Sequence, residues 1–346
     1  MVRVRHIFGL LSAVSLFALF SAASMCAESS EYRVIKKIKI GGEGGWDYIT
    51  VDDTRRRLFI PRGTHVAVVD IDSGNPAGDI PDTPGVHGVA LAQNLNRGFT
   101  SNGKANTSTI FNLQTLETLS QVKTGDNPDT IIYDPFTKNV FAFNGGSKDA
   151  TVFRAATGKV VGTIPLGGKP EAAISDGRGK LYVNIEDTGE IAEIDGSTLA
   201  VTRRFSLNPG EKPTGIAMDY AHQHIFSVCR NKMMVVVDIT TGAVVATVPI
   251  GDGADGAGFD PDAGLAFSSN GSGTLTVVSY STSTGKFNIA ATVTTQRSAR
   301  TMAIDPKTHN IYLPCAQMES LPPAAAGTKQ RPSAVKGSFA VLVVGK

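Results

Sequence analysis

The strongest constraint on this 346-residue chain is a hairpin pattern that recurs along most of its length. The clearest copy runs from Val236 to Gly251, where two β-branched runs flank the turn Asp238-Ile239-Thr240-Thr241-Gly242. Alternating β-branched residues favour strands, and glycine supplies the positive φ that a tight turn needs. Related hairpins surround Ser73-Gly74, Thr157-Gly158 and Thr284-Gly285. A hairpin that recurs at a fixed period predicts a repeat architecture.

Each repeat opens with a turn and a short strand, and one residue of each opening marks the period. These residues follow one another at intervals of 40 to 45 positions: Asp47, His87, Asp129, Glu171, Thr214, Asp255 and Arg300. Each interval has room for four short strands, which is the size of one blade of a β-propeller. Seven openings therefore predict an all-β fold with seven blades.

The two ends of the chain predict how the ring of blades closes. The last repeat supplies strands at 302–305, 310–315 and 339–344, and it lacks a fourth. Residues 34–40 match the fourth strand of the other repeats. Pairing of this first strand with the last blade would remove an unpaired sheet edge. We therefore predict one seven-bladed β-propeller over residues 28–346, with its last blade closed by the N-terminal strand.

Residues 1–27 are predicted to be a secretory signal peptide. Arg3 and Arg5 precede an apolar stretch from Ile7 to Ala23, and small residues follow. A retained membrane anchor and lipidation of Cys26 are the alternatives. Cleavage predicts a periplasmic or secreted protein with no membrane span. It also removes two of 33 basic residues, which face 31 acidic ones. The mature chain is then near neutral, which argues against a strong grip on nucleic acid.

The repeat unit resembles a known family. The run Val236–Gly251, the tetrapeptide Leu181-Tyr182-Val183-Asn184 and the turn Gly168-Lys169-Pro170 are similar to the YVTN repeats of YncE-like periplasmic β-propellers. The resemblance covers about residues 31–346. It implies a periplasmic seven-bladed propeller with a binding or scaffold role, and some relatives bind nucleic acid. Because the matching residues build the scaffold, the resemblance says little about activity.

The predicted fold brings the strand openings to one end of a central channel, where they would meet the ends of the second strands. Converging polar groups are typical of a ligand site. The predicted binding residues are Trp46, Asp47, Arg62, His65, Asn102, Asn144 and Asn184. Clustered carboxylates need a compensating cation, so Asp129, Glu171 and Asp255 are predicted to hold Ca²⁺ or Mg²⁺ if a metal is bound. The alternative is that these residues are solvated or cap backbone N–H groups.

Functions from different classes fit this ring. The first is non-catalytic binding of a small polar molecule or a protein partner, by a monomer. The second is a divalent-metal-dependent hydrolase or lyase of the lactonase-like kind, with His87 as base and Arg300 stabilising an oxyanion. The sequence has no Gly-x-Ser-x-Gly, His-Glu-x-x-His or P-loop motif, which favours the first. Nucleic-acid binding is a third alternative, suggested by the family resemblance.

Three further features carry predictions. Residues 318–338 interrupt the last blade without a strand pattern, and they are predicted to be either a lid over the ring or a disordered loop. Cys229 and Cys315 are predicted to be free, mostly buried thiols, because they occupy the same position two repeats apart. His222, His224 and His309 are predicted to lie in loops on the face opposite the ring.

Overall fold

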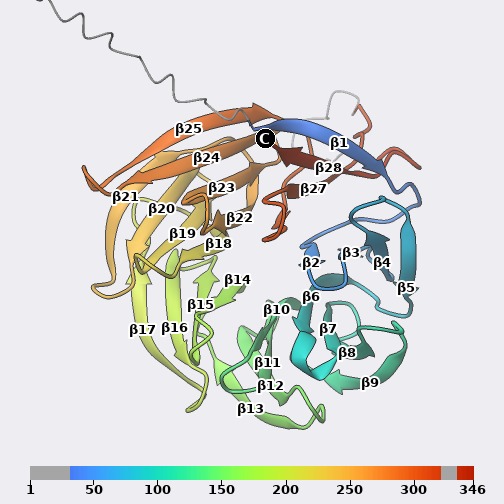
Figure 1. Cartoon of the computed structure of the whole chain (residues 1–346). Helices are drawn as coiled ribbons and strands as arrows, with labels where there is room; N and C mark the ends of the chain where they lie inside the picture. Colours follow the sequence, from blue (N-terminus) through green and yellow to red (C-terminus); the bar gives the residue numbers. More distant parts are fainter. Residues whose placement is uncertain (1–31, 321–332) are drawn as a thin grey trace, which may run out of the picture. The chain divides into compact units, whose positions relative to one another are not determined.

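The computed structural model describes residues 32–320 and 333–346, and these form seven four-stranded antiparallel sheets arranged in a ring (Figure 1). In the first six sheets the first strand lies innermost and borders the central channel, and in the last sheet β26 (Ala303–Ile304) has this place. The inner strands of neighbouring blades contact one another around the channel. The predicted fold class, an all-β seven-bladed propeller, is confirmed.

The first four blades follow the chain in order. Blade 1 contains β2 (Thr50–Asp52), β3 (Arg57–Pro61), β4 (Val66–Asp70) and β5 (Pro76–Ile80). Blade 2 contains β6 (Val86–Ala92), the short 3-10 helix η1 (Gln93–Leu95), β7 (Arg97–Asn102), β8 (Thr107–Asn112) and β9 (Thr118–Lys123). Blade 3 contains β10 (Pro128–Asp134), β11 (Asn139–Asn144), β12 (Asp149–Arg154) and β13 (Val160–Pro165). Blade 4 contains β14 (Pro170–Ser175), β15 (Lys180–Ile185), β16 (Glu190–Asp195) and β17 (Ala200–Ser206).

The last three blades complete the ring. Blade 5 contains β18 (Pro213–Asp219), β19 (His224–Cys229), β20 (Met233–Asp238) and β21 (Ala243–Pro249). Blade 6 contains β22 (Ala254–Asp260), β23 (Leu265–Asn270), β24 (Thr274–Ser281) and β25 (Lys286–Thr294). Blade 7 contains β26 (Ala303–Ile304), β27 (Ile311–Cys315), β28 (Ala340–Gly345) and, from the other end of the chain, β1 (Arg33–Lys39).

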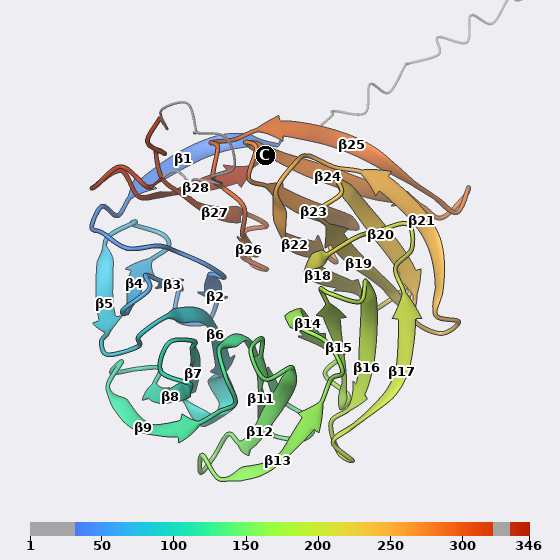
Figure 2. The ribbon, with the colours of Figure 1, turned by 180° about the vertical axis from the view of Figure 1, so that it is seen from behind.

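The ring is closed by pairing between β1 and β28, as predicted. The two strands run antiparallel, from Arg33 opposite Gly345 to Lys39 opposite Ala340, with one bulge between Val34 and Lys36. Figures 1 and 2 show β1 lying along β28 as the outer strand of the last blade. Strands from opposite ends of the chain therefore share one sheet, and this junction holds the circle together.

The recurring Asp-x-x-Thr-Gly sequence has a local physical cause. In the hairpin between β20 and β21, Asp238 Oδ1 accepts hydrogen bonds from the backbone N–H groups of Thr240 and Thr241. Gly242 then takes a φ of 78° and donates its N–H to the Asp238 carbonyl at 2.7 Å. The aspartate holds the turn, and glycine is needed at the left-handed position that follows.

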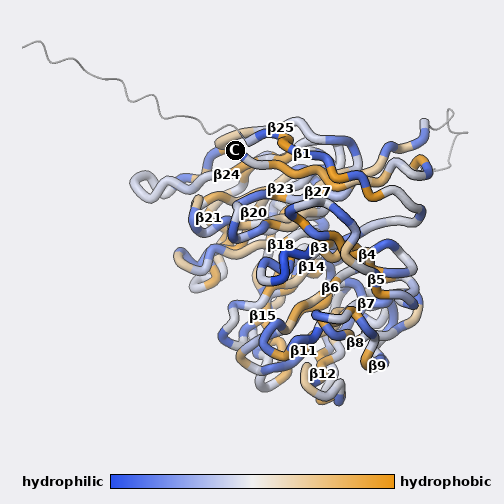
Figure 3. Tube along the Cα trace, turned by 45° about the vertical axis from the view of Figure 1, so that its right-hand side comes forward, coloured by the Kyte–Doolittle hydropathy of each residue, from blue (hydrophilic) through white to orange (hydrophobic). Residues whose placement is uncertain are grey.

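The hydrophobic core lies between adjacent blades. Phe59 of blade 1 packs on Phe111 of blade 2 with ring centroids 5.7 Å apart, and Phe99 of blade 2 packs on Phe153 of blade 3 at 5.9 Å. Figure 3 shows hydrophobic segments running along the strands, with many hydrophilic loops between them. Cys229 and Cys315 are buried and free in the described part of the chain, as predicted.

Two predictions concern segments that the structure describes in part or not at all. The signal-peptide prediction, residues 1–27, lies outside the described residues. Of the insertion 318–338, residues 321–332 also lie outside them. Its described ends form a short antiparallel ladder, which the sequence pattern did not predict. Met318 pairs with Ala334, and the Val335 N–H donates to the Gln317 carbonyl at 2.8 Å. Within residues 32–320 and 333–346, no helix has the length and hydrophobicity needed to cross a membrane.

Truncation of Ile38 tests the closure of the ring. Ile38 lies opposite Val341 in β28 and is only 4% exposed. We expect Ile38→Ala to lower the free energy of unfolding by about 2 kcal/mol or more, because it leaves a cavity in the closing sheet. Urea unfolding measures this change. The matched control is Ile35→Ala on the same strand, where the side chain is 44% exposed. Equal losses in the two variants would show that β1 adds no specific packing to the last blade.

Candidate functional site

Six of the seven strand openings place a charged or titratable side chain in a ring at one end of the central channel. The seventh, Thr214, is fully buried, and its hydroxyl bonds to the Val228 and Ala254 carbonyls. His87, Asp129, Glu171, Thr214 and Asp255 are each the second residue of an inner strand, whereas Asp47 and Arg300 precede β2 and β26. In blades 2 to 6 this residue lies inside a register shift between the inner strand and the second strand. Bulges of this kind re-aim a side chain at the rim of a barrel or next to a site. The ring residues therefore escape the normal alternation of the strand.

The first cluster in the ring joins Asp47, His87 and Asp129, from three consecutive blades. His87 Nδ1 lies 2.8 Å from Asp47 Oδ2 and 3.6 Å from Asp129 Oδ1. Asp129 Oδ1 is buried and has no hydrogen-bond partner among the residues that the structure describes. A single imidazole nitrogen thus faces two carboxylates.

The second cluster is built around Arg300. Its Nη1 donates to Asp255 Oδ2 at 2.9 Å, and its Nη2 donates to the Trp46 carbonyl at 3.0 Å. Nη2 also lies 3.5 Å from Asp47 Oδ1. Both terminal nitrogens are therefore occupied by groups of the protein. Arg300 offsets part of the negative charge of the ring and links blades 6, 7 and 1.

The third cluster contains the predicted Glu171 together with Lys169 and Glu186, which sequence reasoning missed. Lys169 forms ion pairs with Glu171, at 3.1 Å, and with Glu186. Arg230 Nη2 lies 3.4 Å from Glu186 Oε1 on the same side of the ring. The signal available in the sequence was the position of Lys169, two residues before a ring carboxylate. It had been interpreted only as part of a turn.

Burial and repulsion between the carboxylates shift the pKa values of the titratable side chains in the ring. Burial raises the pKa of Asp129 to about 6, and the charge of Asp47 adds to the shift. Burial likewise raises the pKa of Glu171 to about 7, helped by Asp129. Burial raises the pKa of Asp255 to about 7, although the charge of Arg300 opposes it. Burial alone would lower the pKa of His87, but its hydrogen bond to Asp47 and the charge of Asp129 raise it overall. The ring consequently retains protons close to neutral pH.

Tyr48 lies in the channel below the ring, and no sequence pattern indicated it as a site residue. It follows Asp47 in blade 1, yet its side chain packs against the cluster that contains Ala172 and Ile216, from blades 4 and 5. Tyr48 therefore lies across the channel. Its pKa is raised by burial and then by the charges of the ring carboxylates, Asp255 first. The hydroxyl stays protonated and is a hydrogen-bond donor close to the ring.

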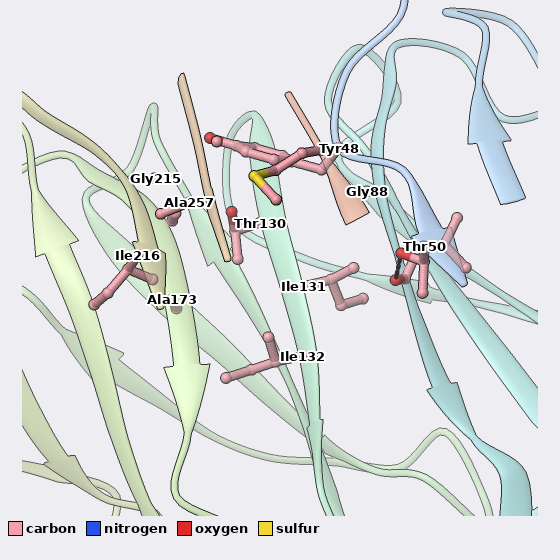
Figure 4. A pocket seen from close by; sticks show the side chains of 14 residues that line it. Tyr48, Thr50, Gly88, Thr130, Ile131, Ile132, Ala173, Gly215, Ile216 and Ala257 are labelled. Atoms are coloured by element: carbon pink, nitrogen blue, oxygen red, sulfur yellow. Dashed lines mark hydrogen bonds between the residues drawn. The ribbon is translucent and has the colours of Figure 1, made fainter. Parts of the chain in front are cut away.

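A cavity of about 230 Å³ lies in the channel next to Tyr48 (Figure 4). Thr130, Ile131, Ile216 and Ala257 of the inner strands line it, together with Tyr48. Glycines at several other inner-strand positions leave its walls as bare backbone. The channel is thus polar at the ring and mainly apolar just beyond it. This cavity is smaller than the range of about 300–1,000 Å³ that is usual for drug-sized ligands.

The predicted asparagines do not face the channel. Asn102, Asn144 and Asn184 are fully buried. The first two bond to hydroxyl or carboxylate groups of the third strand in their own blades, such as Thr109 and Thr151. The second strand alternates its side chains between two packed faces, so its last residue enters the sheet interior. In this conformation the three side chains are enclosed by protein atoms, and ligand binding by them stays a prediction.

Asn184 has a different use, which it shares with two serines. Its amide donates to the carbonyls of Thr214 and Gly215 at the opening of the next blade. Ser101 Oγ donates in the same way to the Asp129 carbonyl, and Ser269 Oγ donates to the Arg300 carbonyl at 2.6 Å. These residues join blades 2, 4 and 6 to the opening residue of the following blade. They are positioning residues, and sequence reasoning missed both serines.

Arg62 and His65 also lie apart from the ring. The Arg62 guanidinium is buried, donates to the Glu43 carbonyl at 2.8 Å and stacks 3.6 Å above the ring centroid of Phe339. Burial lowers its pKa to about 10. His65 lies 3.7 Å from Asp79 on the outer side of blade 1. Arg62 therefore anchors the segment that precedes β2, and His65 belongs to the surface.

Trp46 has a packing role in addition to its place near the ring. Its indole packs against Phe339 with centroids 5.3 Å apart, and its carbonyl accepts the bond from Arg300. A groove of about 1460 Å³ passes Trp46, Arg300 and the described ends of the insertion. The indole thus fills the junction of blades 7 and 1.

The remaining histidines lie at the other ends of the inner strands. His222 Nδ1 lies 2.7 Å from Asp219, the last residue of β18, and His309 Nδ1 lies 2.9 Å from Asp260, the last residue of β22. His224 is buried beside Tyr280 and Phe287. These residues are separated from the ring by the length of a strand.

Comparisons with known proteins support the fold and leave the family open. No family model matches the chain, and no curated protein matches it. Among solved structures, the chain is similar to a β-propeller of hydrazine synthase from Kuenenia stuttgartiensis, with a TM-score of 0.70 and 16% sequence identity. The match covers 80% of this chain and 94% of that chain. At this identity the likeness shows the propeller fold alone. The resemblance to YVTN repeats stays a prediction.

The raised pKa of Glu171 predicts a pH-dependent effect of Glu171→Gln on stability. Because the pKa is about 7 in the folded chain against an ordinary value of 4.5, folding takes up a proton between these values. The stabilising contribution is complete below pH 4.5 and is lost as the pH rises to 7. Glutamine carries no such charge, so the variant should gain stability relative to the wild type between pH 5 and pH 8.

Thermal melting across this pH range measures the difference. The matched control is Glu117→Gln, where the side chain is exposed on the rim of blade 2. Its melting-temperature difference from the wild type should stay flat. A flat or falling difference for Glu171→Gln would mean that this carboxyl is ionised in the folded chain throughout.

Proposed function

We propose that this chain is an exported, YncE-like propeller that binds a small, positively charged polar ligand at its ring and does not catalyse a reaction on it. The charge balance of the ring carries this proposal. Among the described residues, five carboxylates converge there: Asp47, Asp129, Glu171, Glu186 and Asp255. Three permanent cations face them, from Lys169, Arg230 and Arg300.

The imbalance of charge is costly because the carboxylates are poorly solvated. The side chains of Asp129, Glu171 and Asp255 are 13%, 8% and 16% exposed. Carboxylates in such surroundings either keep protons or acquire a cation. A cationic ligand would replace the retained protons and would meet oxygen acceptors on several sides. The same charge disfavours an anionic ligand and the phosphate backbone of a nucleic acid.

The shape of the channel limits the size of the ligand. Tyr48 crosses the channel below the ring, and the cavity beside it measures about 230 Å³. A short, flexible organic cation fits this combination, with its charged groups at the carboxylates and its methylene groups next to the apolar wall of the cavity. A protein partner could reach only the rim.

The contacts of Arg300 weigh against the lactonase-like alternative. That mechanism requires Arg300 as an oxyanion donor, and both of its terminal nitrogens are engaged with Asp255, Asp47 and the Trp46 carbonyl. An anionic transition state would also form among carboxylates. Binding without chemistry uses the ring as it stands. A periplasmic or secreted location and a monomeric state remain part of this proposal.

Three four-carbon probes of equal length test the proposal by calorimetry: putrescine, 1,4-butanediol and succinate. Putrescine is the dication, butanediol is neutral and succinate is the dianion. We expect measurable binding of putrescine alone, which weakens as salt is added. Asp255→Asn should weaken it by about tenfold, because one acceptor of the ammonium group loses its charge.

The control for this test is Asp72→Asn, a change of equal charge at an exposed site away from the ring. It should leave putrescine binding unchanged. Binding of succinate or butanediol as tight as that of putrescine would overturn the proposal, and so would the absence of putrescine binding to the wild-type chain.

A further inference from the structure

Three side chains in the ring have the spacing of metal ligands. Single donor atoms of Asp47, His87 and Asp129 all lie within 4.8 Å of one another. His87 Nδ1 is 2.8 Å from Asp47 Oδ2 and 3.6 Å from Asp129 Oδ1. Bond lengths of about 2.0–2.2 Å place neighbouring ligands of a tetrahedral ion about 3.4 Å apart. The two observed separations bracket this value, so an ion needs only small side-chain movements.

The hydrogen bonding at this cluster is incomplete without a cation. Asp129 Oδ1 is buried beside His87 Nδ1 and has no partner within residues 32–320 and 333–346. A proton on His87 Nδ1 is directed to Asp47 at 2.8 Å and leaves Asp129 unpaired. A buried carboxylate oxygen without a partner is costly. One divalent ion between the three atoms would satisfy both carboxylates at once.

The surroundings hold the three ligands in place. Ser101 Oγ accepts a hydrogen bond from the Gly88 N–H at 3.0 Å and donates to the Asp129 carbonyl, which joins the backbone beside His87 to that of Asp129. Between blades 7 and 1, Thr301 Oγ1 donates to the Asp47 carbonyl at 3.0 Å. Supporting contacts of this kind are what a preorganised metal site needs.

Gly103 provides the space for the imidazole. A Cβ atom at this position would lie 2.8 Å from His87 Nε2 and 2.7 Å from Asn127 Oδ1. The ring of His87 therefore packs directly on the backbone of Gly103, with Nδ1 turned to the carboxylates. Any side chain at position 103 would displace the imidazole.

We propose that Asp47, His87 and Asp129 bind one first-row divalent ion, Zn²⁺ or Mn²⁺, through His87 Nδ1 and one oxygen of each carboxylate. One imidazole and two carboxylates suit these ions better than Ca²⁺, which prefers six or more oxygen ligands. The site differs from the sequence-based set, because Glu171 and Asp255 already pair with Lys169 and Arg300. With three protein ligands, the ion keeps open positions for water or a polar group of the ligand.

This inference rests on the proposed function, since it identifies one cation that the acidic ring takes. Isothermal titration of the untagged, EDTA-treated full chain with ZnCl₂ and with MnCl₂ tests it. We expect one ion per chain for at least one of the two metals, and a higher melting temperature in its presence. CaCl₂ and MgCl₂ should give weaker binding.

Two substitutions at the same ring separate ligation from simple charge attraction. Asp129→Asn removes a ligand and a charge, and Asp255→Asn removes only a charge of the ring. We expect the first to weaken metal binding by at least about tenfold and the second by about threefold or less. Gly103→Ala changes no charge and should weaken binding as Asp129→Asn does, because it displaces His87. Melting curves without metal establish that each variant is folded.

The outcomes distinguish this inference from the proposed function. Loss of binding in His222→Gln, with binding retained in Asp129→Asn, would move the metal to the opposite face and overturn the inference. Equal effects of Asp129→Asn and Asp255→Asn would reduce it to nonspecific attraction and overturn it as well. Binding of putrescine without Zn²⁺ or Mn²⁺ refutes the metal site alone. Binding of neither refutes both.

Discussion

The pairing of β1 with β28 is the interaction on which the rest of the structure depends. It joins the two ends of the described chain in one sheet and turns seven blades into a closed ring. Where blades 7 and 1 meet at the channel, Arg300 donates to the Trp46 carbonyl and Thr301 donates to the Asp47 carbonyl. Closure therefore fixes Asp47 relative to Arg300, although 253 positions separate them in the sequence. Without the pairing of β1 with β28, blade 1 would be free to move away from blade 7 and the ring would open.

A closed ring forces like charges together. Each repeat contributes one opening residue, and the channel brings Arg300, Asp47, His87 and Asp129 into contact in this order around the ring, with successive side chains 2.8–3.6 Å apart. Carboxylates that would be independent on an open surface then compete for Arg300, Lys169 and His87. The shortage of positive charge is a property of the ring as a whole. Burial is the largest cause of the raised pKa values of Asp129, Glu171 and Asp255, and repulsion between the carboxylates adds to it. The same shortage leaves one oxygen of Asp129 without a partner among the described residues.

The sequence predicted the architecture because the repeat depends on local chemistry. The Asp-x-x-Thr-Gly turns and the alternating strands can be recognised without knowing where the blades lie. The period then locates the inner strands and the ring position in each blade. The last repeat contains only three strands, which predicted that the N-terminal strand would supply the fourth. These features are set by residues close together in the chain, which is where sequence patterns are most informative.

The details of the ring were harder to predict, because they depend on contacts between blades. The asparagines at the ends of the second strands appeared equivalent to ring residues, yet they point into the sheets and bond to neighbouring strands. Tyr48 crosses the channel to the far side, which no local pattern shows. The predicted metal ligands were chosen by charge alone. The positions of Lys169 and Arg300 decide which carboxylates are already paired, and only the folded ring reveals them.

The central claim is that the ring lacks positive charge and holds protons near neutral pH until a cation replaces them. Carbon-13 NMR of the carboxyl groups, followed from pH 3 to pH 9, tests it directly, with Asp129→Asn, Glu171→Gln and Asp255→Asn providing the assignments. The account predicts midpoints of about 6 for Asp129 and about 7 for both Glu171 and Asp255. It also predicts that bound putrescine moves them to lower pH. Midpoints at ordinary carboxyl values, near pH 4, for all three residues would contradict the account.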